Sequence, residues 1–166
     1  GADAHCQSLA EASRSGNKTW RAYLSTSIEG RSAVNAGDRI GSGPWYNLNE
    51  MLIARGVTDL HTNDSKLNKD MALNELGETV NGVGDSPNRH DILTGTLSDG
   101  TAAIGMSCDN WASNSSESNS MLGHFDRQGG GDAGSSWNAA HPSRGCSQEN
   151  LEGTGGAGLF YCFAID

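Results

Sequence analysis

The segment Cys108-Asp109-Asn110-Trp111 and the terminal run Leu159-Phe160-Tyr161-Cys162-Phe163-Ala164-Ile165 decide how this chain is organised. Between them lies a Ser/Gly/Asn-rich excursion that is far longer than an ordinary connection between two elements. Cysteines stand where the structured runs enter and leave this excursion. The pattern predicts a scaffold that presents a large loop region, about residues 108–150, pinned by disulfide bonds.

The four cysteines are Cys6, Cys108, Cys146 and Cys162. None forms a Cys-x-x-Cys pair, so the pattern favours structural disulfides in an oxidising compartment over a zinc ribbon or a redox motif. Three pairings are possible. The nested pairing of Cys6 with Cys162 and Cys108 with Cys146 is favoured, because it ties the first helix to the last strand and separately closes the long loop. We therefore expect a secreted or cell-surface protein.

Length and composition predict one domain, residues 1–166, with much of its chain in loops. A chain of 166 residues can bury a real core. Hydrophobic residues make up 35% of it, against about 45 to 50% in a typical domain by a count that includes glycine, and 23 residues are glycine. The start Gly1-Ala2-Asp3 is expected for a processed mature form or a fragment of a longer protein.

The net charge excludes several kinds of partner. Eleven Lys and Arg residues against 20 Asp and Glu residues give a formal charge of −9. Such a surface disfavours nucleic acid, heparin-like polyanions and anionic membranes. No run of about 18 apolar residues is present, so no membrane span is expected.

Local patterns predict several elements. Apolar residues at helical spacing predict a helix over 2–14, and alternation predicts a strand over 20–25. Asn47 followed by Glu50 is typical of a capping box and predicts a second helix over 47–55. Residues 91–104 are typical of a hairpin that turns at Ser98-Asp99-Gly100. The run 159–165, apolar on both faces, predicts a central final strand.

Several short motifs occur in an order that resembles a known fold. They are an early helix with a cysteine, Trp20-Arg21-Ala22-Tyr23-Leu24-Ser25, Asp38-Arg39-Ile40, Thr94-Gly95-Thr96, Cys108-Asp109-Asn110-Trp111 and Tyr161-Cys162-Phe163. Together they resemble the endostatin-like branch of the C-type lectin-like fold, including arrangements found in secreted or surface-anchored bacterial proteins. The resemblance implies an α+β fold with two helices on a twisted, mostly antiparallel sheet, a long loop region on one side, and the same nested disulfides.

The loop region supplies the candidate calcium ligands. Trp137-Asn138-Ala139 is similar to the Trp-Asn-Asp triplet that binds calcium in sugar-binding C-type lectins, but Ala139 lacks the carboxylate, and no Glu-Pro-Asn partner triplet occurs. That calcium site is therefore not expected. Asp126 and Asp132 are the candidate ligands for a different calcium site, because the loop is rich in oxygen donors. Further oxygen donors of the loop are Asp109, Asn110, Asn114 and Asn138. The alternative is that these acidic and amide side chains form a solvated surface.

Zinc and catalysis are not expected from the sequence. The five histidines show no short ligand spacing, and only His5 lies where the amino-terminal zinc site of vertebrate endostatins gathers its histidines. There is no Gly-x-Ser-x-Gly motif and no phosphate-binding loop, and no cysteine stays free if all four pair.

Aromatic residues on loops suggest a ligand-binding face. Trp45 and Trp137 could stack on a sugar or anchor a protein, with Asn138, Asp109 and Asn110 beside them; the alternative is that the tryptophans pack in the core. The sequence thus predicts a non-enzymatic recognition or adhesion domain that binds an extracellular protein or glycan, for example in a matrix. The alternative is a self-assembling structural subunit of a surface layer, filament or larger assembly.

Overall fold

The computed structural model describes residues 1–27, 31–62, 65–129 and 134–166, and it mixes short helices with small sheets. In chain order the elements are α1 Ala2–Ala12, β1 Trp20–Ala22, η1 Ala36–Asp38, β2 Trp45–Tyr46, β3 Leu52–Ala54, α2 Val57–Leu60, β4 Asp91–Leu93, α3 Cys108–Trp111, β5 Met121–His124, β6 His141–Pro142, α4 Gln148–Glu152, β7 Gly156–Phe160 and β8 Cys162–Ala164. The arrangement agrees with the α+β expectation at the level of its elements. Among the described residues, no helix has both the length and the apolar character that crossing a membrane requires.

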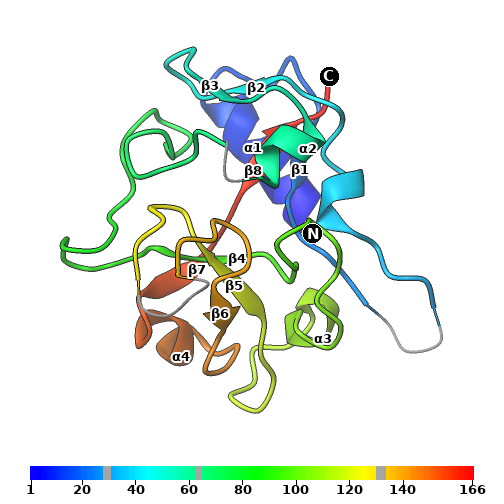
Figure 1. Cartoon of the computed structure of the whole chain (residues 1–166), viewed down its shortest axis with the longest axis vertical. Helices are drawn as coiled ribbons and strands as arrows, with labels where there is room; N and C mark the ends of the chain where they lie inside the picture. The colour runs from blue at the N-terminus through cyan, green and yellow to red at the C-terminus, as the bar shows by residue number, and fades with distance from the viewer. Residues whose placement is uncertain (28–30, 63–64, 130–133) are drawn as a thin grey trace.

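The strands of the described residues form three separate sheets. β1 pairs with β8, β2 pairs with β3, and a four-stranded sheet has the order β6-β5-β4-β7. Figure 1 shows the four-stranded sheet and α4 in one half of the molecule, and α1, β1, β8 and the β2–β3 pair in the other. Within the larger sheet, β4 is antiparallel to β5 and parallel to β7. This sheet positions the site described below.

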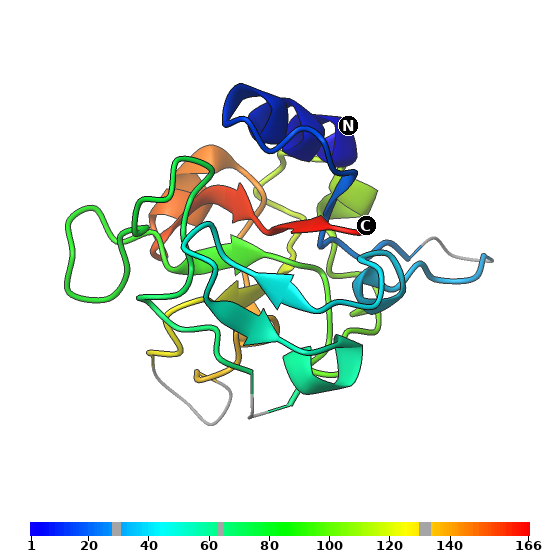
Figure 2. The same cartoon turned by 90° about the horizontal axis from the view of Figure 1, so that it is seen from above.

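The predicted first helix is confirmed as α1, which buries Cys6 and Ala10. The predicted strand is shorter than expected, and β1 pairs antiparallel with β8 in the register Trp20↔Ala164. Figure 2 shows α1 as an outer layer of the molecule beside these strands. The nested pairing is also confirmed, with Cys6–Cys162 linking α1 to β8 and Cys108–Cys146 closing a loop with a sequence separation of 38.

The predicted helix over 47–55 is wrong. The Asn47 side chain accepts hydrogen bonds from the backbone N–H groups of Asn49 and Met51, at 3.0 Å each, and so forms a turn. Glu50 has a left-handed φ of 59°, which a right-handed helix cannot contain. An asparagine that can cap a helix can equally compete with helix formation by closing a local turn, and the residues that follow enter β3.

Two other predictions hold in part. The hairpin over 91–104 begins as β4, and its turn is closed by hydrogen bonds between Leu97 and Thr101 and between Gly100 and Leu97. The final run 159–165 does not form one central strand. It divides between β7 in the four-stranded sheet and β8 in the pair with β1. One long strand and two short strands in different sheets can have the same run of apolar residues. The pattern therefore does not distinguish the two arrangements.

Candidate metal centre

Three adjacent strands of the four-stranded sheet bring three histidines and one aspartate together. Asp91, the first residue of β4, lies directly opposite His124, the last residue of β5. His141 on β6 lies opposite Leu122, two residues before His124. Side chains two apart on a strand share a face, so the register places all three ligating side chains on one face. His90 precedes β4, and its ring stacks on that of His124 with centroids 4.1 Å apart.

The donor atoms of these side chains converge. The Nε2 atoms of His90 and His124 each lie 3.2 Å from Oδ1 of Asp91. The Nε2 atom of His141 lies 3.6 Å from the same oxygen and 3.0 Å from Nε2 of His124. Tetrahedral zinc with bonds of about 2.0 to 2.1 Å separates its ligand atoms by roughly 3.3 Å. The four separations given above, 3.0 to 3.6 Å, lie close to this value.

Each imidazole is held through its other nitrogen. Nδ1 of His90 lies 3.2 Å from Oδ1 of Asp126, Nδ1 of His124 lies 2.9 Å from the Gly134 carbonyl, and Nδ1 of His141 lies 2.9 Å from the Pro142 carbonyl. A carbonyl oxygen only accepts, so Nδ1 of His124 and of His141 carries the proton and donates. In the neutral imidazole this leaves the Nε2 lone pair directed into the cluster, which is the tautomer that a metal requires.

Asp91 is unusual among the buried polar groups of the described chain. Its side chain is 1% exposed, and neither Oδ1 nor Oδ2 has a hydrogen-bond partner. The histidine nitrogens approach Oδ1 closely without hydrogen-bond geometry. A buried carboxylate without donors is costly, and lone pairs of neighbouring imidazoles repel one another. A cation among these four donors would remove both penalties.

The donor set favours zinc over calcium. Three imidazole nitrogens and one carboxylate oxygen suit zinc and related transition metals, whereas calcium requires six to eight oxygen ligands. A divalent ion with Asp91 leaves one net positive charge, and the Asp126 carboxylate at His90 balances it. Burial opposes protonation of His124, yet the Asp91 carboxylate and the Gly134 carbonyl raise its pKa, since both favour a positive charge at this ring.

Asp126, a predicted calcium ligand, supports a histidine instead. Its side chain is fully buried. Its oxygens accept from the backbone N–H groups of Val83 at 2.8 Å and Gln128 at 3.1 Å, besides facing Nδ1 of His90. These contacts direct the carboxylate of Asp126 toward the backbone and the His90 ring. Asp132, the other predicted metal ligand, lies outside the described residues.

Three of the predicted ligand-binding residues are buried. Trp45, Trp137 and Asn138 are 6%, 2% and 1% exposed, so they do not form the expected surface platform. The indole of Trp45 donates to the Ala164 carbonyl, and that of Trp137 donates to the Leu60 carbonyl. Both tryptophans therefore pack in the core, which was the alternative interpretation, and each indole N–H has a backbone partner inside the protein.

The other two predicted residues lie in a left-handed turn. Asp109 is exposed, whereas Asn110 is half-buried, and its Oδ1 accepts from the backbone N–H of Ser27 at 2.7 Å. All four residues of α3 have positive φ values, between 48° and 66°. The Cys108–Cys146 disulfide and a hydrogen bond from the Trp111 indole to the Ser25 carbonyl hold this turn. Asp109 and Asn110 belong to this turn and not to the strands of the histidine cluster.

Sequence reasoning missed the histidine cluster because its members are dispersed. His90 and Asp91 are adjacent, but His124 and His141 are 34 and 51 residues away from His90 in the chain. The one local signal is a His-Asp pair at the start of a predicted hairpin strand. Only the strand register brings the other histidines to it, and the register is not encoded in any one segment. No protein-family model matches this sequence, and no curated protein matches it either.

Proposed function

We propose that this chain binds a divalent transition metal, zinc by preference, through His90, Asp91, His124 and His141. The observation that carries the proposal is the approach of three Nε2 atoms to Oδ1 of Asp91 at 3.2, 3.2 and 3.6 Å, while no described residue donates a hydrogen bond to that carboxylate. Four protein donors complete a tetrahedral shell, which is typical of structural zinc. The centre would cross-link β4, β5 and β6, and we propose no catalytic role for it.

Metal content and thermal unfolding test this proposal. The oxidised chain should bind about one zinc per molecule, and zinc at 100 times its dissociation constant should stabilise the fold by about 2.7 kcal/mol. For a chain of this size that raises Tm by roughly 5 to 10 °C over a chelator-treated sample. Calcium at the same concentration should leave Tm unchanged. An unchanged Tm with zinc, together with less than stoichiometric metal, would contradict the proposal.

Variants separate specific binding from chance contacts. His124→Ala removes a buried ligand and should abolish the zinc-dependent rise in Tm. His5→Ala is the matched control, because His5 is exposed on α1, and it should keep the full rise. Equal loss in both variants would indicate non-specific binding.

The wider role that we propose is recognition or adhesion outside the cell, on an endostatin-like C-type lectin-like fold. Two disulfide bonds and the antiparallel pairing of β1 with β8, which joins the early chain to its end, support this proposal. Its ligand would be an extracellular protein or glycan. A glycan array probed with zinc-loaded protein tests it, since saturable binding to a defined glycan would identify a ligand, and an array without signal would argue against the glycan.

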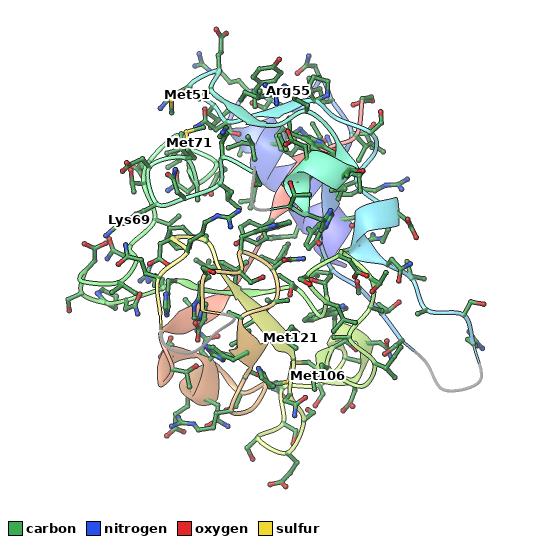
Figure 3. All side chains as sticks on the ribbon, viewed as in Figure 1. Met51, Arg55, Lys69, Met71, Met106 and Met121 are labelled. Atoms are coloured by element: carbon green, nitrogen blue, oxygen red, sulfur yellow. A yellow bond between two sulfur atoms is a disulfide. The ribbon has the colours of Figure 1, made fainter. Side chains whose placement is uncertain are left out.

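A second candidate function, self-assembly, is favoured by an exposed apolar surface beside the β2–β3 pair. Tyr46, Leu48, Met51 and Leu76 are 58%, 45%, 39% and 67% exposed. Figure 3 shows Met51 and Met71 on this side of the molecule, and the Asn47 side chain donates to the Met71 carbonyl. Sedimentation at several concentrations tests the idea with Leu48→Ser and Leu76→Ser combined. Association of the unaltered chain that the variant loses supports assembly, and a monomer throughout contradicts it.

A further inference from the structure

His141 differs from the other members of the metal centre in its exposure. The side chains of His90, Asp91 and His124 are 8%, 1% and 3% exposed, whereas that of His141 is 39% exposed. The donor atoms of the three buried residues all lie within 4.8 Å of one another. They form a compact three-ligand core, and His141 approaches it from the solvent side.

His141 is also the least firmly held of the three histidines. Nδ1 of His90 contacts a fully buried carboxylate, and Nδ1 of His124 contacts the carbonyl of Gly134, ten residues away. Among the described residues, Nδ1 of His141 contacts only the carbonyl of its own neighbour, Pro142. β6 itself has two residues, stands at the edge of the sheet and pairs with β5 alone. The Nε2 atom of His141 lies 3.6 Å from Oδ1 of Asp91, whereas the Nε2 atoms of His90 and His124 each lie 3.2 Å from it.

We infer that His141 is an exchangeable ligand, and that the metal accepts an external imidazole, such as a histidine side chain of a binding partner, in its place. This inference depends on the proposed metal binding. Three buried protein donors and one replaceable position are the pattern of metal sites that take an outside ligand. An imidazole matches the group that leaves, and it is neutral, so the formal charge of −9 does not repel it.

Exchange at the metal would give the domain a recognition site at an edge of its sheet. The incoming imidazole forms one metal–nitrogen bond as the bond to Nε2 of His141 breaks, so the coordination number and the net charge stay the same. His141 would then be free to turn outward into solvent. A partner would be selected by a histidine that reaches this edge, with no change in the buried ligands.

Cobalt(II) substitution tests this inference, because its visible absorption reports coordination geometry. The probe is free imidazole, added to the cobalt-loaded protein and to its His141→Ala and His124→Ala variants. We expect imidazole to change the spectrum of the unaltered protein saturably. His141→Ala should bind cobalt at least about ten times more tightly than His124→Ala, because it keeps the buried three-ligand core. Imidazole should restore a tetrahedral spectrum in His141→Ala and not in His124→Ala.

Several outcomes would overturn the inference. One is loss of cobalt binding in His141→Ala as complete as in His124→Ala, and another is a spectrum that imidazole leaves unchanged in both the unaltered protein and His141→Ala. A His141→Gln variant with circular dichroism identifies any failure to fold, since glutamine keeps the polar edge position. If the unaltered protein binds no cobalt or zinc at all, the proposed metal binding itself fails, which is a separate result from binding without exchange.

Discussion

At the scale of single residues, the burial of the Asp91 carboxylate is unfavourable in the absence of a metal. This carboxylate is buried and receives no hydrogen bond from the part of the chain that the structure describes, and Nε2 atoms of three histidines lie around one of its oxygens. This arrangement is unfavourable in a chain without metal and favourable in a chain with it. Removal of the Asp91 charge should therefore stabilise the metal-free chain and destabilise the metal-bound chain.

Asp91→Asn should stabilise the metal-free fold and abolish its response to zinc. At about pH 9, removal of the buried charge should raise the free energy of unfolding in chelator by about 1 to 3 kcal/mol. At about pH 7.5 the same variant should show no zinc-dependent rise in Tm. Urea unfolding and thermal scans measure the two effects. Asp70→Asn, at an exposed position, is the control, and a similar gain in that variant would contradict the explanation.

Asp126→Asn should weaken zinc binding without removing a ligand. Asp126 is a positioning residue, since its carboxylate faces Nδ1 of His90 and fixes the tautomer that directs Nε2 inward. Loss of such a partner typically costs about 10- to 100-fold in metal affinity. Competition with a coloured chelator measures the dissociation constant, and the cobalt spectrum should stay tetrahedral. A changed spectrum would mean that Asp126 acts on the first shell directly.

At the scale of elements, the close approach of β5 to the backbone of Trp137 leaves no room for a side chain at Gly123. A Cβ added to Gly123 would overlap the Trp137 carbonyl group and lie 2.5 Å from Cα of Asn138. Gly123→Ala should therefore lower the free energy of unfolding by more than about 3 kcal/mol, because backbone atoms cannot yield as a side chain can. Gly37→Ala is the matched control, since its Cβ would meet its nearest atoms at ordinary distances of 3.4 to 3.7 Å. Denaturant unfolding compares the two, and equal effects would contradict this reasoning.

Acid pH should weaken the docking of α1 on β1, because the Asp3 carboxylate of α1 accepts a hydrogen bond from the Ala22 backbone N–H of β1. Burial opposes ionisation of Asp3, but hydrogen bonds from the Ala22 backbone N–H and the Arg39 guanidinium outweigh it and lower its pKa below 3.8. A depressed carboxyl pKa stabilises the fold above the unfolded value and loses that effect as pH falls through the folded value. Asp3→Asn should thus be less stable than the unaltered chain at neutral pH, and the gap should close below about pH 3.8. A constant gap in urea unfolding from neutral to acid pH would contradict this.

At the scale of the whole molecule, the two disulfides restrain different lengths of chain. Chain-entropy arithmetic gives about 4 kcal/mol for the separation of 38 residues between Cys108 and Cys146 and about 5 kcal/mol for the 156 between Cys6 and Cys162, each taken singly. Replacing Cys108 and Cys146 together by serine should lower the free energy of unfolding by about 4 kcal/mol. Zinc affinity should persist, because neither cysteine belongs to the centre. Loss of zinc binding in a variant that still folds would show that the loop closure positions His141.

Prediction from sequence succeeded where a local or covalent pattern was sufficient and failed where long-range pairing decided. The apolar spacing of residues 2–14 was enough for α1, because helical hydrogen bonds are local. The same kind of reasoning failed for 47–55, where the Asn47 side chain closes a turn and β2 supplies a strand partner. It left Trp45 and Trp137 between a surface platform and the core, because no local pattern shows that each indole donates to a backbone carbonyl far away in the chain.

The sequence by itself determined the mixture of helix and strand and the acidic composition, because composition and periodicity are properties of the chain alone. It favoured the nested disulfides among three possible pairings, and the structure shows that pairing. Only the tertiary structure decided the metal centre. His90, Asp91, His124 and His141 meet because β4, β5 and β6 pair in one register, and a shift of one residue would turn His124 to the other face of the sheet. That register is set by packing across the whole sheet, so no single segment of the sequence specifies it.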